Sequence, residues 1–414
     1  MKLKELAKID ISRAGRFCRM WLGDINGDGR MEIIMVQPDS DLDDRYFPHS
    51  VYCATAFDLE GNLLWQIGEP DPNAKSSGAD IPAQVYDIDG DGCLEFICAR
   101  DGKLQIYDGK TAELKREAPL PDQYAHDCII IADLEGKGRP QNIILKNRYE
   151  KLWALSSDLN VMWEHVGNVG HYPWPHDLNG DGREELIAGY TVLDGDGKPL
   201  WEIDMKDHAD CIWIGDINAD GKPEVVVGGD DITAWTHDGK LLWRFDDTVE
   251  SQNVAIGNLR PELPGLEICG LDRIDRGNPG LDGIFIVSSE GKSLYKEHRT
   301  VPGWSSVCTV ISNLDGKGTD NVLAYRRGAL PNAVYDGYLN TIFNFPFDGY
   351  VLWGDLTGNG ANQLIVYSQT EALIYSATDV DLNVKAAHTL PQPKRLYNNT
   401  RYWGGEASNI NSTT

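Results

Sequence analysis

Eight copies of one glycine-rich acidic motif recur along the chain, and this repeat constrains the fold more than any other feature. The fullest copy reads DINGDGRMEII. The copies begin at Asp24, Asp87, Asp133, Asp177, Asp216, Asn258, Asn313 and Asp355. Because one such unit cannot bury its apolar face alone, the repeat predicts copies of a single supersecondary unit that pack against their neighbours.

Each copy lies in the same frame of short strands. In the fifth copy, Cys211-Ile-Trp-Ile precedes the acidic loop, Glu224-Val-Val-Val follows it, and a third run leads to the turn and strand Gly239-Lys-Leu-Leu-Trp. Four short strands separated by turn signals are typical of a β-propeller blade. We therefore predict an all-β protein, an eight-bladed β-propeller with calcium-type DxDGDG loops. Seven blades plus one degenerate unit is the alternative.

The two ends of the repeat region predict how the ring closes. The last copy reaches its third strand at 371–375 and then loses the strand pattern, so the segment 3–11 is expected to supply the missing outer strand. This closure would remove free sheet edges. No linker divides the repeats, and we predict one propeller domain over 1–386. The polar segment 387–414 is expected to be an extended tail, either a packing strap or partly disordered.

Charge and composition limit the partners and the compartment. The net charge of −26 argues against nucleic acid and against an anionic membrane. No apolar run reaches the ~18–20 residues of a membrane span, and the first residues have no signal-peptide core. We expect a monomer that is cytoplasmic, or secreted with its leader absent from this sequence. The eight cysteines form no short framework and predict buried free thiols.

Four of the acidic loops keep oxygen-bearing side chains at alternate positions around a glycine turn. Calcium takes six to eight oxygens at about 2.3–2.6 Å, and this spacing supplies them from one loop. The predicted calcium ligands are Asp24, Asn26, Asp28 and Glu32; Asp87, Asp89, Asp91 and Glu95; Asp177, Asn179, Asp181 and Glu185; and Asp216, Asn218, Asp220 and Glu224. The alternative is that these residues form Asx-type turns without metal, as Lys137 and Lys317 indicate for two degenerate copies. In either case the loops have a structural role.

Candidate chemistry lies at the opposite mouth of the ring, where residues that enter the first strand of each blade meet the loops between second and third strands. Three consecutive blades have a histidine at the start of the first strand. The catalytic candidates are His126, His171, His208, Tyr149, Tyr190 and Arg148, and the substrate-binding candidates are Arg45, Tyr46, His49, Asp80, Asp127, Asp210, Arg273 and Arg326. A lone histidine is usually structural, but three in register beside Tyr and Arg favour function.

This set of side chains suits β-elimination from a uronic acid. Histidine titrates near neutral pH and can remove the C5 proton. Tyrosine can protonate the departing oxygen at C4, and arginine can neutralise the carboxylate whose charge grows in the transition state. A channel calcium could also supply that charge. A hydrolase remains an alternative, because Asp80, Asp127 and Asp210 could form a carboxylate pair.

The run GYTVLDGDGKPLW at 189–201, followed by Asp207-His208-Ala209-Asp210, resembles the rhamnogalacturonan lyases of polysaccharide lyase family 11. In that family a His-Gly-Asp segment precedes a similar acidic loop of an eight-bladed, calcium-bearing propeller. Ala209 replaces that glycine and this chain is shorter. It therefore resembles more closely the compact propeller lyases, namely the ulvan lyases and the rhamnose–glucuronate lyases of family 27. The repeat resemblance covers residues 14–377.

The resemblance implies a lyase that acts on a rhamnose-linked uronic acid, with glucuronate expected ahead of galacturonate and calcium as cofactor. In the compact lyases, histidines and tyrosines from neighbouring blades act at the channel mouth, which implies the same place for the catalytic candidates here. Acidic-loop propellers also occur in non-enzymatic proteins. The alternative is therefore a calcium-binding propeller that binds a glycan or a protein without catalysis.

Overall fold

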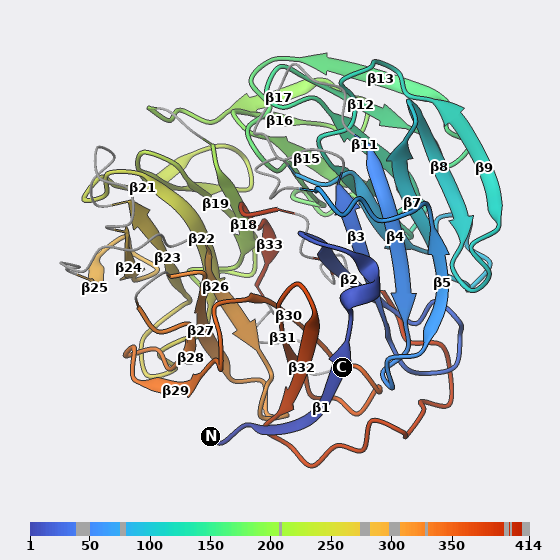
Figure 1. Ribbon diagram of the computed structural model, residues 1–414. Coiled ribbons are helices and arrows are strands. Elements are labelled where there is room, and N and C mark those ends of the chain that lie inside the picture. Colours follow the sequence, from blue (N-terminus) through green and yellow to red (C-terminus); the bar gives the residue numbers. More distant parts are fainter. Residues whose placement is uncertain are drawn as a thin grey trace.

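The computed structural model describes residues 1–38, 50–74, 80–206, 209–273, 282–297, 307–327, 330–392, 397 and 400–407. Within these residues the chain forms eight separate sheets of four antiparallel strands, and one of them gains a fifth, parallel strand from the C-terminal segment. Figure 1 shows the sheets arranged in a ring around a central axis. The eight-bladed propeller is confirmed, and the seven-bladed alternative is wrong.

Blades 1 to 4 follow each other along the chain, each sheet in sequence order. The strands are β2 (Arg19–Gly23), β3 (Glu32–Pro38), β4 (Val51–Phe57) and β5 (Leu63–Ile67); β6 (Ala83–Tyr86), β7 (Glu95–Arg100), β8 (Lys103–Asp108) and β9 (Leu114–Pro119); β10 (Ile129–Ala132), β11 (Asn142–Lys146), β12 (Lys151–Leu155) and β13 (Val161–Val166); β14 (Trp174–His176), β15 (Glu185–Ala188), β16 (Thr191–Leu193) and β17 (Pro199–Glu202).

Blades 5 to 8 continue the ring. Their strands are β18 (Cys211–Gly215), β19 (Glu224–Gly228), β20 (Ile232–Thr236) and β21 (Leu241–Phe245); β22 (Ser251–Gly257), β23 (Glu267–Arg273), β24 (Asp282–Val287) and β25 (Ser293–Lys296); β26 (Val307–Ser312), β27 (Asp320–Tyr325), β28 (Ala333–Tyr335) and β29 (Thr341–Asn344); β30 (Tyr350–Gly354), β31 (Gln363–Tyr367), β32 (Glu371–Ser376) and β1 (Lys4–Asp10). The 3-10 turn η1 (Ser12–Ala14) follows β1.

Burial along the strands explains the order within a blade. The first strand of blade 3, β10, is buried at all four positions, whereas its outer strand β13 alternates between exposed and half-buried residues. First strands of neighbouring blades contact each other from blade 1 to blade 7. A fully buried inner strand and an alternating outer strand are what a sheet with one edge in the core and one edge in water requires.

The N-terminal strand closes the ring as the sequence predicts. β1 pairs antiparallel with β32, with Lys4 opposite Ser376 and Asp10 opposite Glu371. Blade 8 therefore combines strands from both ends of the repeat region, and β1 covers the edge that β32 would otherwise leave open.

The C-terminal segment enters the ring from the acidic-loop side and turns back near the opposite mouth. Tyr397 forms an antiparallel bridge with Trp21 of β2, so this part of the tail runs toward the mouth. The short strand β33 (Gly405–Glu406) pairs parallel with β18, with Gly405 opposite Trp213, so it runs away from the mouth. Figure 1 shows β33, in red, near the centre of the ring. The reversal between them leaves 400–402 at the mouth.

Specific contacts hold the described tail residues inside the ring. The Leu390 amide donates to Asp24 Oδ2 at 2.9 Å, and the Tyr172 hydroxyl donates to Tyr397 Oη at 2.8 Å. The backbone of Gly29, at φ +87°, approaches the tail so closely that an added Cβ would lie 2.3 Å from the Ala386 carbonyl oxygen. Only glycine adopts this positive φ without strain and leaves room for the Ala386 carbonyl, so Gly29 of the acidic loop also allows the tail to pack against it.

Two further features concern the whole described chain. All eight cysteines are free thiols, and Cys93 alone among them is exposed. Within the described residues, no helix has the length and apolar character needed to cross a membrane.

Candidate functional site at the channel mouth

Side chains from blades 3, 4 and 5 meet at the mouth opposite the acidic loops. His171 precedes β14, Asp210 precedes β18, and Tyr149 lies in the loop between β11 and β12. Backbone hydrogen bonds join these segments. The Val169 amide donates to the Tyr149 carbonyl at 2.8 Å, and the His171 amide donates to the Ala209 carbonyl at 3.1 Å. Three neighbouring blades thus fix the relative positions of these functional groups.

Gly170 permits this close approach of blades 4 and 5. It has φ +62°, and a Cβ at this position would lie 2.7 Å from the Ala209 carbonyl oxygen. Any other residue would be strained in conformation and would displace the backbone that orients His171.

His171 is the centre of a hydrogen-bonding and stacking group. Its Nε2 lies 3.2 Å from the Tyr149 hydroxyl oxygen and 3.2 Å from Asp210 Oδ1. The ring of Tyr402, from the C-terminal segment, stacks on the imidazole with centroids 3.8 Å apart. His171 and Asp210 are buried, whereas Tyr149 is half-buried. Of the three hydrogen-bonding groups, Tyr149 is therefore the one that can reach a ligand.

A buried charge network lies beside this group. Asp127 Oδ2 accepts a hydrogen bond from Lys146 Nζ at 2.5 Å, and Asp127 Oδ1 lies 3.5 Å from Arg148 Nη1. Lys146 is completely buried, and its ammonium also donates to the carbonyls of Asn147 and Arg148 at 2.9 and 2.8 Å. The Arg148 guanidinium lies 5.5 Å from the centre of the Tyr149 ring. The network therefore places the positive charge of Arg148 close to the Tyr149 ring.

The same network shifts the pKa values of its carboxyl groups in opposite directions. Burial and the neighbouring Asp127 carboxylate raise the pKa of Asp80. Burial opposes ionisation of Asp127 as well, but Lys146 and Arg148 outweigh it and hold the pKa of Asp127 below its usual range. Burial and then Asp210 raise the pKa of Tyr402 far above that of a free tyrosine, so its ring stacks on His171 as a neutral phenol.

The structure brings together some of the predicted mouth residues and leaves others apart. His126 is buried beside Asp127 and meets Tyr124 edge to face at 6.3 Å. Tyr190 is half-buried against the apolar cluster of the first five blades. Arg326 lies on another part of the mouth, 4.7 Å from the centre of the Tyr350 ring. His208, Arg45, Tyr46 and His49 lie outside the described residues, as does the side chain of Arg273.

Lys146, Arg401 and Tyr402 were missed by the sequence reasoning. Lys146 ends the apolar run Asn142-Ile-Ile-Leu-Lys, and a lysine in a buried strand requires a buried partner, which is a signal the sequence contains. The aromatic and basic run Arg401-Tyr-Trp was a weaker signal, because it falls in a segment that otherwise reads as a polar tail.

The acidic loops differ in how well they could hold a cation. In the loops at Asp177 and Asp216, backbone amides orient the carboxylates, as from Gly182 to Asp177 Oδ2 and from Gly221 to Asp216 Oδ2, both at 2.9 Å. Burial, together with Asp220 and Asp216, raises the pKa of Glu224 to about 7. A divalent cation would relieve this concentration of negative charge, so these donor sets fit calcium.

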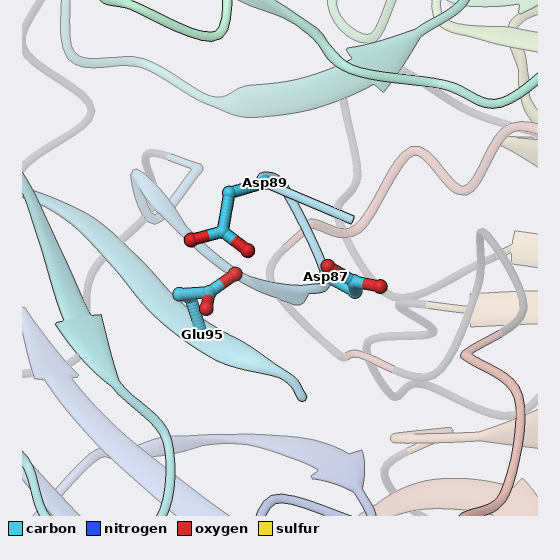
Figure 2. Close-up of side chains that lie close together, drawn as sticks. All are labelled: Asp87, Asp89 and Glu95. Atoms are coloured by element: carbon cyan, nitrogen blue, oxygen red, sulfur yellow. The ribbon is translucent and has the colours of Figure 1, made fainter. Parts of the chain in front are cut away.

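In blade 2 a lysine of the chain meets the carboxylates instead. Oxygens of Asp87, Asp89 and Glu95 lie within 4.8 Å of one another (Figure 2). The ammonium of Lys115 lies 2.8 Å from Asp89 Oδ2 and 2.7 Å from Glu95 Oε1. In blade 1, Lys385 Nζ similarly lies 2.6 Å from Asp28 Oδ2. A cation in either loop would compete with an ammonium group, so these two loops fit calcium less well.

The fold and this site define an eight-bladed propeller with an acid–base group of Tyr, His and Asp at one mouth. In sequence the chain is similar to two proteins of Bacillus subtilis. It is 25% identical to rhamnogalacturonan exolyase YesX over 342 residues, which are 65% of this chain and 54% of that protein. It is 24% identical to rhamnogalacturonan endolyase YesW over 316 residues, 60% of this chain and 50% of that protein. The chain thus spans about half the length of these relatives.

Solved structures show the same fold. The exotype rhamnogalacturonan lyase YesX superposes with a TM-score of 0.64 at 18% identity, over 99% of this chain and 76% of that one. The V. cholerae biofilm matrix protein Bap1 gives a TM-score of 0.59 at 14% identity, over 96% of both chains. No protein-family model matches the chain. The sequence similarity is thus to rhamnogalacturonan lyases, and the fold is shared more widely.

Proposed function

We propose that this protein is a polysaccharide lyase that cleaves a rhamnose-linked uronic acid by β-elimination and leaves an unsaturated uronate. The observation that carries the proposal is the contact of His171 Nε2 with both the Tyr149 hydroxyl and Asp210, at 3.2 Å each. The sequence similarity to two rhamnogalacturonan lyases supports it independently.

The reaction requires one proton to leave the substrate and one to reach the departing group. A base removes the C5 proton, the electrons of the C5–H bond form the C4=C5 double bond, and the C4–O bond breaks as its oxygen takes up a proton. Tyr149 is the half-exposed member and faces the sugar. It first passes its hydroxyl proton to His171 Nε2, and Asp210 stabilises the imidazolium that forms. The Tyr149 phenolate then removes the C5 proton, and the restored hydroxyl gives that proton to the departing C4 oxygen.

Positive charge near Tyr149 favours this chemistry. The Arg148 guanidinium lies 5.5 Å from the centre of the Tyr149 ring. Its positive charge stabilises negative charge on the phenol oxygen, which makes Tyr149 a stronger acid toward the leaving group. The Arg148 side chain is only 3% exposed and is held by Asp127. Its role in this proposal is therefore to set the potential at Tyr149 rather than to clamp the substrate.

Two uronates are candidates for the cleaved sugar. The relatives are named for rhamnogalacturonan, which makes a rhamnose–galacturonate backbone the first substrate to test. The resemblance to compact lyases favours glucuronate, and a rhamnose–glucuronate glycan belongs on the same panel. Calcium in the loops at Asp177 and Asp216 is part of the proposal as a structural cofactor.

The test is the ultraviolet absorbance of the conjugated double bond in the product. Wild type should generate it on one of the two glycans. Tyr149→Phe, which keeps the ring and removes only the hydroxyl, should lower kcat by about 10²–10⁴-fold, the usual contribution of a general acid or base. His171→Ala should show a similar loss. His237→Ala, in the turn after β20, is the matched control and should match wild type.

Two outcomes would contradict the proposal. Equal activity of Tyr149→Phe and wild type would place the reaction elsewhere. Binding of a glycan without any unsaturated product would instead favour a non-catalytic, glycan-binding propeller.

A further inference from the structure

A second group of charged side chains lies at the mouth, around Tyr350 at the start of β30. The Arg19 guanidinium lies 3.9 Å from the centre of the Tyr350 ring, and that of Arg326 lies 4.7 Å from it. Arg401 of the C-terminal segment contributes a third positive charge to the same ring. Blades 1, 7 and 8 and the tail thus converge on one tyrosine.

These three arginines have phenols and one another as neighbours. The Arg19 charge interacts with Tyr350, Tyr367 and Tyr325, and the Arg401 charge interacts unfavourably with Arg19 and Arg326. Burial and the charge of Arg19 lower the pKa of Arg401. Among the described residues, no Asp or Glu forms an ion pair with any of the three.

Other buried arginines of this acidic protein have carboxylate partners. Arg327, next to Arg326 in the chain, binds Glu297 Oε2 at 2.5 Å, and Arg148 faces Asp127. Gathering three guanidinium groups without a carboxylate partner among the residues that the structure describes is electrostatically unfavourable, and a bound anion would balance their charge. Arg19 is buried, but Arg326 and Arg401 are half-buried and can contact a ligand.

We propose that Arg19, Arg326 and Arg401 form an oxyanion-binding subsite for an acidic group of the glycan, either a uronate carboxylate or a sulfate ester. The proposal rests on the proposed function, since it places a second acidic group of the same substrate. Arginine binds such oxyanions with two parallel hydrogen bonds. Arg401 and Tyr402 are adjacent residues with Cα atoms about 3.8 Å apart, so the subsite borders the His171 group through the tip of the tail.

Tyr350 provides a direct readout of binding. Burial would raise the pKa of its phenol, but Arg19, Arg326 and Arg401 outweigh burial and lower it to about 8. The neighbouring phenol of Tyr367 has its pKa raised far above the usual value by burial. Wild type therefore gains tyrosinate absorbance at mildly alkaline pH. Subtracting the absorbance that Tyr350→Phe gains leaves the contribution of Tyr350 alone.

The experiment titrates tyrosinate absorbance in sodium chloride, sodium glucuronate or sodium sulfate at equal ionic strength. A bound anion cancels part of the arginine charge, so the midpoint should rise by about one pH unit. Whichever of glucuronate and sulfate acts at the lower concentration identifies the preferred anion. The half-buried Arg326 is the residue to change, and Arg326→Met should raise the midpoint by itself and abolish most of the response.

Arg260→Met is the matched control, because Arg260 also lies over a tyrosine, 4.5 Å from the ring centre of Tyr338, but on the acidic-loop side. It should respond to the anions as wild type does. A wild-type midpoint that neither anion moves would overturn the subsite. A midpoint shift in Arg326→Met as large as that of wild type would overturn it as well. The titration needs no turnover, so its outcome is separate from the test of the lyase reaction.

Discussion

Asparagine in place of Asp127 should destabilise the protein strongly. Asp127→Asn keeps the shape of the side chain but leaves the completely buried Lys146 and the 3%-exposed Arg148 facing a neutral amide. Breaking a buried ion pair on one side costs about 3–5 kcal/mol. At an unfolding entropy of about 2.1 cal/mol/K per residue, 414 residues give about 0.9 kcal/mol/K, so the expected fall in Tm is about 3–6 °C.

Differential scanning calorimetry of three variants tests this reasoning. Asp196→Asn removes an exposed carboxylate that lies 2.7 Å from Arg183 Nη2, and it should cost at most about 1 kcal/mol. Asp127→Asn with Lys146→Met removes one stranded cation and should recover much of the lost stability. A Tm for Asp127→Asn equal to that of Asp196→Asn would refute the argument.

The loss of stability caused by Asp127→Asn should also depend on pH, and it should become smaller in acid. The folded-state pKa of Asp127 is lower than its unfolded value of about 3.9. Its contribution is therefore fully present above about pH 4 and is lost as the pH falls through the folded-state pKa. The Tm difference between wild type and Asp127→Asn should shrink below about pH 4. A difference that grows in acid would contradict this assignment.

The remaining predictions concern calcium and the acid–base group. Excess EDTA should lower the Tm of calcium-loaded protein, because a ligand at a hundred times its Kd stabilises the native state by about 2.7 kcal/mol; an unchanged Tm would argue against calcium. Lys115→Met should enlarge the rise in Tm that calcium produces, since the ammonium no longer competes for Asp89 and Glu95, and a response equal to wild type would show no competition. Arg148→Met should lower kcat with little change in KM, because the guanidinium acts on Tyr149 and not on the substrate, and steady-state kinetics with kcat unchanged would mean that charge near Tyr149 is supplied by other groups.

The blade architecture was predictable because it depends on local pattern. Each acidic loop, its flanking apolar runs and the glycine turn before the fourth strand lie within one repeat, and their spacing sets the frame of four strands. Closure by β1 was also accessible, since the last repeat lacks one strand and the first segment has one to spare. The register of the blades then predicted which residues face the mouth.

The pairing of side chains at the mouth was not predictable in the same way. His126 and His171 are equivalent by position, yet His171 meets Tyr149 and Asp210 whereas His126 lies beside Asp127, whose carboxylate is taken by Lys146. Strand register fixes the end of the blade at which a residue lies, but packing between blades decides its contacts.

The path of the C-terminal tail inside the ring could not be predicted from the sequence either. The segment that brings Tyr402 onto His171 has its own short strand and contacts that span hundreds of positions, as between Tyr172 and Tyr397. No local pattern specifies such a contact, because its stability comes from the shape of a channel that exists only once the ring has formed.

The pairing of β1 with β32 has a consequence for the order in which the protein is made. Asp10 pairs with Glu371, so 360 residues separate them. At about 5–20 residues per second, a ribosome needs on the order of 20–70 s to supply the partner of β1. During that time the first strand is an unpaired edge, and Lys4, Glu5 and Lys8 place charge along it. Charged side chains of this kind discourage pairing with other chains, so the composition of β1 suits a strand that must remain soluble until the last blade is complete.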